Sequence, residues 1–408
     1  MPMIPITEAI DIIKRETARL GFEIVAVEEA VGRVLAEEIV ADTDLPPFDR
    51  SQMDGFAVVA SDTANAPVEL RIVGESAAGK GWHHELKPGE AIRIMTGAPV
   101  PFGADAVQRS ELAREAGEFV TILEPTTTGR FIVARGSEGK MGDKVFSSGE
   151  VVDINMIACL AAFGYAMVKV AKQPRVAILG TGSEIVEVDQ TPGTDQIRNS
   201  NSVMLKVLAE KCGATVELFP ITGDNLSDLK SQISVAVGLN ESAIRNPQSQ
   251  ILIITGGVSV GKYDLTKAAL LELGAEIFFD KLQLKPGKPM VFAKLKETLV
   301  FGLPGNPVSA AVTFHLFVRT AILQMQGSAE TGLTEGFAVM GSDVKGATER
   351  DTYLPARLET DQTGHLIANS LRWQGSSDFI GFARANALIV VPKGKSFDRG
   401  EAASILFL

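Results

Sequence analysis

The sequence predicts a multidomain protein of mixed α/β and β class, whose central part is a doubly wound parallel sheet. The chain has 408 residues, more than one ordinary hydrophobic core holds, so several domains are expected. Between residues 173 and 326, short apolar runs alternate with amphipathic helical segments, the pattern of parallel strands joined by helices. Before and after that region, short β-branched runs separated by Gly, Pro and Asp indicate β-rich domains.

The N-terminal part of the chain begins with a helix predicted from Thr7 to Leu20, where apolar residues recur at helical spacing and Gly21 provides the stop. A small strand-rich domain is expected from Val40 to about Ser137. A second, apolar helix is predicted from Asp153 to Phe163. We expect the two helical segments to belong to one elongated piece.

The α/β region opens at Pro174. In such sheets ligands bind at the carboxyl ends of the strands, and the glycine-rich turns of this chain fall at those ends. From Glu330 onward strands and turns return, which predicts a small C-terminal β domain. In the α/β region the expected strands are Arg175–Gly180, Thr215–Phe219, Gln250–Thr255, Glu276–Phe279 and Leu299–Gly302, and the expected helices are Ser202–Cys212, Leu226–Val237, Thr266–Leu273 and Pro307–Met325.

Composition and charge argue against several kinds of partner. The net charge of −11 disfavours nucleic acid, whose phosphates require a basic face. Cys159 and Cys212 form no CxxC pair, and free thiols fit a reducing cytoplasm. No signal peptide is expected, and the uncharged run from Thr298 to Val318 is interrupted by glycines and prolines, which predicts a strand, a turn and a helix. We therefore expect a cytoplasmic protein with neither nucleic acid nor membrane as partner.

The turns between residues 251 and 307 carry the most informative chemistry. A strand that ends in glycines exposes backbone N–H groups to an anion, and nearby lysines add positive charge. Lys285-Pro286-Gly287-Lys288 fits a type II turn that brings the two lysine Cα atoms within roughly 7 Å, although a surface hairpin is the alternative. Asn306 is expected to cap a helix with Pro307 at its first position. The candidate phosphate-binding residues are Gly256, Gly257, Ser259, Gly261, Lys285, Lys288, Pro304 and Asn306.

The glycine-rich loop after Thr255 comes close to the P-loop of nucleotide hydrolases. Gly256 is followed by four residues and then by Gly261 and Lys262. The next residue is Tyr263, where a P-loop has the Ser or Thr that binds magnesium. A hydrolase of that kind and a plain tight turn therefore stay as alternatives to an anion-binding loop.

Three acidic residues are expected at matching ends of the predicted sheet: Glu184, Asp224 and Asp264. Carboxylates crowded together repel one another unless a cation or a proton intervenes, although each alone is more often a helix cap. The four histidines lack the spacing of metal ligands, so the expected ion is hard and bound by oxygen, such as Mg²⁺. We expect Mg²⁺ at these three carboxylates.

In order along the chain, these residues resemble the molybdopterin molybdenumtransferases, a family that includes the C-terminal part of gephyrin. The resemblance covers essentially the whole chain and runs through residues 46–58, 93–99, 197–202, 256–267, 284–289 and 302–309. It implies four domains: an elongated dimerisation domain (residues 1–42 and 137–172), an inserted β-rich domain (43–136), an α/β molybdopterin-binding domain (173–326) and a C-terminal β-barrel domain (327–408).

The implied reaction inserts molybdenum from molybdate into adenylated molybdopterin and releases AMP, with Mg²⁺ as cofactor. The resemblance implies a homodimer whose active site is shared between subunits, supplied by a molybdopterin adenylyltransferase and followed by cofactor-handling proteins. Ser183 stands where many members have Asp or Asn before the glutamate, which predicts a weaker metal shell. Pro355 stands where some members carry Arg, which predicts the loss of an arginine contact to the ligand. By resemblance the functional positions are Asp54, Thr96, Glu184, Asp224 and Asp264, and Ser376 is a further candidate in the polar loop Gly375–Asp378.

Two readings compete with the transferase. A non-catalytic molybdopterin-binding or scaffold protein of the same fold would need partner-binding segments beyond an enzyme-length chain. A hydrolase that uses the loop ending in Lys262 would turn over ATP without any pterin.

Overall fold

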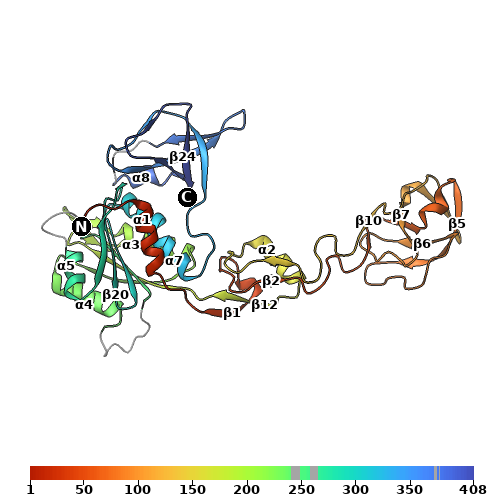
Figure 1. Cartoon of the computed structure of the whole chain (residues 1–408), viewed down its shortest axis with the longest axis horizontal. Coiled ribbons are helices and arrows are strands. Elements are labelled where there is room, and N and C mark those ends of the chain that lie inside the picture. The colour runs from red at the N-terminus through yellow and green to blue at the C-terminus, as the bar shows by residue number, and fades with distance from the viewer. Residues whose placement is uncertain (240–248, 258–264, 372–374, 376) are drawn as a thin grey trace. The chain divides into compact units, whose positions relative to one another are not determined.

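The computed structural model describes residues 1–239, 249–257, 265–371, 375 and 377–408. Four predicted site residues, Ser259, Gly261, Asp264 and Ser376, therefore lie outside the described part of the chain. The chain divides into two compact units, and each is considered by itself (Figure 1). The first unit holds residues 1–37, 148–157 and 167–408, and the second holds residues 38–147 and 158–166.

A six-stranded sheet forms the centre of the first unit. Its strands lie in the order β16 (Thr215–Thr222), β13 (Arg175–Thr181), β17 (Ile251–Thr255), β21 (Thr298–Leu303), β20 (Pro289–Leu295) and β18 (Glu276–Lys281). The first four strands are parallel, as predicted. Strand β20 runs antiparallel to both of its neighbours, β21 and β18. The expectation of a wholly parallel sheet is therefore wrong at this edge. The reason is local: only two residues separate β20 from β21, too few for the crossover that a parallel pair needs.

Helices cover both faces of this sheet, which confirms the doubly wound arrangement (Figure 1). Helices α4 (Leu226–Ala236) and α5 (Leu265–Glu272) share an apolar core with one face. The other face packs against α1 (Ile6–Glu16), α3 (Ser200–Lys211) and a helical stretch made of α6 (Pro307–Thr313), a π-helical turn (Phe314–Val318) and α7 (Arg319–Met325). That stretch is long and apolar enough to cross a membrane, yet most of it is buried within the protein.

Helix α1 contributes Ile6, Ala9 and Ile13 to the core of the α/β sheet. The sequence interpretation placed this segment in the elongated piece. Its predicted extension to Leu20 is too long, because the helix ends at Glu16. Beyond it, β1 (Phe22–Ala26) pairs antiparallel with β12 (Met167–Ala171), and α2 spans Ile154–Ala162.

The C-terminal part of the first unit is a closed five-stranded barrel. Strands β24 (Asp351–Thr360), β25 (Leu366–Ser370), β22 (Glu335–Met340), β28 (Ala402–Phe407) and β26 (Ala387–Val391) pair in this order, and β26 pairs again with β24. This confirms the predicted β barrel. The short β19 (Leu284–Lys285) joins β24 in parallel and so links the barrel to the α/β sheet. A short helix, α8 (Phe379–Phe382), precedes β26.

The second unit is built on a six-stranded sheet, which confirms the predicted strand-rich domain. Its order is β7 (Ala106–Arg109), β4 (Gly55–Val58), β6 (Glu90–Ile94), β5 (Val68–Ser76), β9 (Phe119–Ile122) and β8 (Ala113–Ala116). Because successive side chains of a strand point to opposite faces, its residues divide between two apolar cores. One core holds Phe56 and Val58, and the other holds Ala57 and Ile92.

Candidate active site

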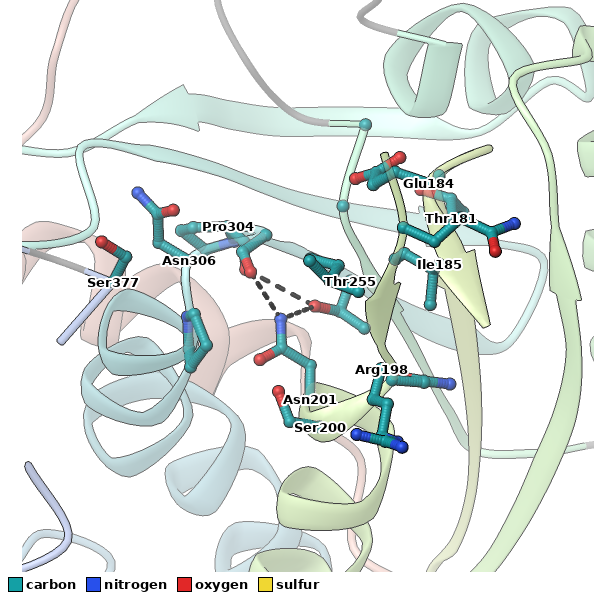
Figure 2. A pocket seen from close by; sticks show the side chains of 18 of the residues that line it. Thr181, Glu184, Ile185, Arg198, Ser200, Asn201, Thr255, Pro304, Asn306 and Ser377 are labelled. Atoms are coloured by element: carbon teal, nitrogen blue, oxygen red, sulfur yellow. Dashed lines mark hydrogen bonds between the residues drawn. The ribbon is translucent and has the colours of Figure 1, made fainter. Parts of the chain in front are cut away.

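A cavity of about 1100 Å³ lies in the first unit, at the carboxyl edge of the four parallel strands (Figure 2). Its walls come from the turns after β13, β16, β17 and β21, from the start of α3 and from the barrel. The predicted site residues among its lining are Glu184, Asp224, Gly256, Gly257, Pro304 and Asn306. Parallel strands present their carboxyl ends at one edge, which is why residues distant in sequence meet here.

The two loops that follow β17 and β21 are in close contact. Thr255 and Leu303 are paired in the sheet, and Gly256 N donates to Leu303 O at 3.2 Å. A Cβ on Gly305 would lie 3.7 Å from the Cα of Gly256. The glycine-rich loop and the Pro304–Asn306 loop therefore border the cavity together.

Gly256 occupies a position that no other residue fits. Its φ is +100°, and a Cβ added there would lie 2.2 Å from the carbonyl oxygen of Thr181. Gly257 follows with φ +62°. Glycine at both positions lets the backbone of this loop approach both the neighbouring strand and a ligand closely.

The two described carboxylates of the site, Glu184 and Asp224, both line the cavity and are exposed to it. Asp224 N donates to Ser183 Oγ at 3.0 Å, and Ser183 N donates to Asp224 Oδ2 at 3.4 Å. Ser183, noted above as a departure from the family pattern, thus ties the turn after β13 to the turn after β16. In the described residues no three His, Cys, Asp or Glu side chains are grouped closely enough to hold a metal by themselves.

The sequence interpretation missed the residues that join these turns. Asn201 Nδ2 donates to Thr255 Oγ1 at 2.9 Å and to Gly305 O at 2.8 Å (Figure 2). Asn199 Oδ1 caps α3 by accepting from Ser202 N at 3.2 Å. Asn199 directly precedes the first residue of α3, and Asn is a common N-cap residue, so the sequence could have located Asn199. The contacts of Asn201 depend on tertiary structure. Arg198 also lines the cavity, and its Nε donates to Gln190 O at 3.0 Å.

The two predicted lysines are not among the residues that line the cavity, although Pro289, the neighbour of Lys288, is. Lys285 ends β19 and is exposed, while Lys288 O accepts from Leu282 N at 2.9 Å. The segment forms a bend with a cis Lys285–Pro286 peptide bond, so the predicted type II turn is wrong. Contact of either lysine with a phosphate stays a prediction.

The barrel adds Ser377 and Phe379 to the lining of the cavity. Asp378 Oδ1 accepts from Gly381 N at 3.0 Å, which caps the short helix α8. Pro355 is buried in β24, where it pairs with Leu388. It therefore belongs to the barrel wall.

In the second unit, the sequence-predicted residues Asp54 and Thr96 are directly bonded. Asp54 Oδ1 accepts from Thr96 N at 2.7 Å and from Thr96 Oγ1 at 2.9 Å. The backbone N–H, and after it the hydroxyl, lowers the pKa of the exposed Asp54 carboxyl below its ordinary value. Ser51 links the same two loops, because its N–H donates to Ala98 O and its carbonyl accepts from Gly97 N.

Comparison with known proteins covers the whole chain. Residues 4–164 match the family model of the MoeA N-terminal region (domain I and II), residues 177–324 a probable molybdopterin binding domain, and residues 338–408 the MoeA C-terminal region (domain IV). The chain is 35% identical to a molybdopterin molybdenumtransferase of Staphylococcus aureus (strain COL), over 99% of this chain and 95% of the relative. It belongs to the molybdopterin molybdenumtransferase family.

Further members of the family agree with this assignment. A molybdopterin molybdenumtransferase of Bacillus subtilis (strain 168) is 35% identical, over 99% of this chain and 94% of the relative. The crystal structure of a molybdopterin biosynthesis MoeA protein from Pyrococcus horikoshii OT3 is 30% identical, covers 100% of both chains and superimposes with a TM-score of 0.84. The fold and the domain types described above are therefore those of this transferase family.

The donors at the cavity fit a Mg²⁺ ion that is held together with a phosphorylated ligand. Mg²⁺ takes oxygen ligands and is commonly bound by one or two carboxylates plus phosphate oxygens. Glu184 and Asp224 supply carboxylates at one cavity wall, and the glycine loop at Gly256 and Gly257 supplies backbone toward the same space. A Mg²⁺ held by these carboxylates would offset their charge and bind phosphate oxygens, whereas the two carboxylates alone would repel an anion.

Proposed function

We propose that this transferase inserts molybdenum from molybdate into adenylated molybdopterin, in a Mg²⁺-dependent reaction that releases AMP and forms molybdenum cofactor. Membership of the family supports a role in molybdenum cofactor biosynthesis. The observation that supports molybdate insertion with Mg²⁺ and AMP release is the cavity itself. It collects two carboxylates and two Gly- or Pro-containing loops at one sheet edge, the combination that a magnesium-bound phosphoanhydride needs.

In this proposal each wall of the cavity has a defined task. Gly256 and Gly257 bring backbone close to the phosphate, and Pro304 and Asn306 border it from the neighbouring loop. Glu184 and Asp224, with Asp264 as predicted third ligand, hold Mg²⁺, which when bound offsets the negative charge of the anhydride. Lys285 and Lys288 are proposed to reach the same phosphates, and Ser376 to contact the ligand from the barrel.

The proposal includes a homodimer with a shared active site and the four-domain division predicted from the sequence. Asp54 and Thr96 of one subunit would then complete the cavity of the other. Their direct hydrogen bonds support a common task, because two donors to Oδ1 hold the carboxylate ionised and oriented. A molybdopterin adenylyltransferase would supply the substrate and cofactor-handling proteins would receive the product, in the cytoplasm.

The decisive test is AMP release from adenylated molybdopterin in the presence of Mg²⁺, with and without molybdate. Molybdate-dependent release is expected from the wild type, and a loss of at least about 100-fold in Glu184→Gln and Asp224→Asn. Glu187→Gln and Asp228→Asn are matched controls, because both residues are exposed, lie close in sequence to the site and do not line the cavity.

Other outcomes separate the alternatives. Tight binding of molybdopterin with no AMP release under any oxyanion would favour a binding or scaffold protein. ATP hydrolysis without pterin, lost in Lys262→Ala, would favour the hydrolase. Equal activity of the two carboxamide variants and their controls would contradict the assignment of this cavity as the active site.

A further inference from the structure

We propose that Asn201 is a positioning residue that holds the glycine loop after β17 and the Pro304–Asn306 loop after β21 at the spacing the ligand requires. The inference rests on the proposed function and concerns the same cavity. Asn201 stands at the start of α3, on an element separate from both loops. Its side-chain nitrogen donates to Thr255, directly before the glycine loop, and to Gly305, within the Pro304–Asn306 loop (Figure 2).

The two protons of the Asn201 amide are both in use. One goes to Thr255 Oγ1 at 2.9 Å, directly before Gly256, and the other goes to Gly305 O at 2.8 Å. A carbonyl oxygen cannot donate, so the atom facing Gly305 O has to be the nitrogen. Thr255 Oγ1 in turn donates to Pro304 O at 3.4 Å. The three residues thus form a closed set of contacts that ties the end of β17 to the loop after β21.

The oxygen of the same amide makes no hydrogen bond with the residues that the structure describes. Asn201 is 9% exposed, and its Oδ1 is buried. An acceptor buried in this way lowers stability relative to an apolar side chain of the same shape. A leucine would fill the volume without that cost, but it would leave Gly305 O and the two loops without their link. The physical benefit of asparagine here is therefore the placement of the loops.

The loops are close enough for this link to matter to the ligand. A Cβ on Gly305 would lie 3.7 Å from Gly256 Cα, so a displacement of either loop changes the wall of the cavity directly. A displacement of substrate-positioning groups by about 1 Å can lower turnover by about 100-fold. We expect kcat/KM to fall by about 10- to 100-fold when the link is lost.

The test uses Asn201→Asp, because an aspartate changes its donor capacity with pH. When protonated, the new carboxyl donates one hydrogen bond to Gly305 O; when ionised, it donates none and repels that oxygen. Burial beside carbonyl oxygens raises the pKa of such a carboxyl, so the switch is expected between about pH 5 and 8. The activity of Asn201→Asp relative to wild type should therefore recover as the pH falls, while that of Asn201→Leu should stay low at every pH.

Normalising to the wild type removes the titration of the charged side chains that line the cavity, Glu184, Asp224 and Arg198. Asn155→Asp is the matched control: the same substitution at an exposed residue in the first turn of α2, where a carboxylate is well tolerated. It should show wild-type activity and no pH-dependent recovery. Thermal unfolding of each variant separates loss of fold from loss of placement.

Calorimetric binding of AMP with Mg²⁺, as product of the proposed reaction, gives a readout that needs no turnover. Weaker binding in Asn201→Leu, and pH-dependent weakening in Asn201→Asp, would support the inference even if the wild type released no AMP. Wild-type kcat/KM and AMP affinity in both variants would overturn it while leaving the proposed function standing. A loss of kcat/KM in Asn201→Asp that does not change with pH and accompanies a fall in Tm would mean that Asn201 only packs in the core. That result would also overturn the inference. A wild type that neither turns over nor binds AMP would overturn both proposals.

Discussion

The carboxylate of Asp54 accepts two hydrogen bonds from one residue, the backbone N–H and the hydroxyl of Thr96, at 2.7 and 2.9 Å. Forty-two positions of sequence separate the two residues, and the strands β4 and β6 that pair beside them bring their loops together. Both donors stabilise the charged form of the carboxyl, which is why the pKa of Asp54 is lowered. An exposed carboxylate fixed in this way is held in its ionised form.

The first prediction concerns this pair. Thr96→Val removes the hydroxyl donor, so the pKa of Asp54 should rise toward its ordinary value while the backbone N–H preserves part of the effect. The acidic limb of the pH–activity profile should move to higher pH, whereas activity at neutral pH should change little, because the carboxyl is ionised there in both proteins. NMR titration of the Asp54 carboxyl measures the shift. Thr96→Ser keeps both donors and should behave as the wild type; an unchanged pKa in Thr96→Val would contradict the assignment.

The second prediction concerns the glycine loop. Gly256→Ala should lower the free energy of unfolding by about 2–4 kcal/mol, because it combines a φ of +100° with a Cβ placed 2.2 Å from Thr181 O. Gly274→Ala is the matched control: its φ is +83°, but a Cβ there meets no atom within 4 Å. That control should cost only about 1 kcal/mol. Urea unfolding compares the two, and equal losses would show that crowding against Thr181 plays no part.

The third prediction is a pH dependence of stability from His315. Burial lowers the pKa of its imidazole to about 4 from an ordinary value of 6.5. Between about pH 4 and 6.5 the imidazole is protonated in the unfolded chain but neutral in the folded chain. The free energy of unfolding is therefore highest above pH 6.5 and falls as the pH drops from 6.5 to about 4. The loss amounts to roughly 3 kcal/mol. His315→Gln should flatten the difference between unfolding curves at pH 7 and pH 5, and an unchanged pH slope in that variant would refute the prediction.

The fourth prediction concerns the ion pair between Lys267 of α5 and Asp280 of β18. Only 7% of the Asp280 side chain is exposed. Burial opposes its charge, but the hydrogen bond and the charge of Lys267 outweigh burial and lower the pKa of the carboxyl. Lys267→Met should destabilise the protein by about 2 kcal/mol or more, because a buried carboxylate loses its principal partner.

A double substitution serves as the control for this pair. Lys267→Met combined with Asp280→Leu should recover most of the loss, since two apolar side chains of similar volume pack without an uncompensated charge. Additive losses in the double variant, measured by urea unfolding, would mean that the two side chains do not depend on each other.

Much of the architecture follows from local sequence patterns. The strands Arg175–Thr181, Ile251–Thr255 and Thr298–Leu303 are buried apolar runs that end in glycine or proline turns, and the carboxyl ends of parallel strands meet at one edge. For that reason the sequence alone predicts that Glu184, Asp224, Gly256 and Asn306 lie at one edge of the sheet. The strand-rich character of the C-terminal part and of the second unit was predictable for the same kind of reason, from short runs separated by turns. The closed barrel was expected only from the resemblance to the family.

Only the tertiary structure decided which residues connect those parts. Strand pairing sets the antiparallel edge at β18 and β20, and hydrophobic periodicity does not encode which strands pair. Periodicity likewise does not encode the packing of α1 on the α/β core or the bend at Lys285–Lys288. The link from Asn201 to Thr255 and Gly305 spans 54 and 104 positions of sequence. Local sequence determines where a strand ends, because backbone propensity acts over a few residues. Which side chain then bridges two strand ends is decided by distance in space, and only the folded chain sets that distance.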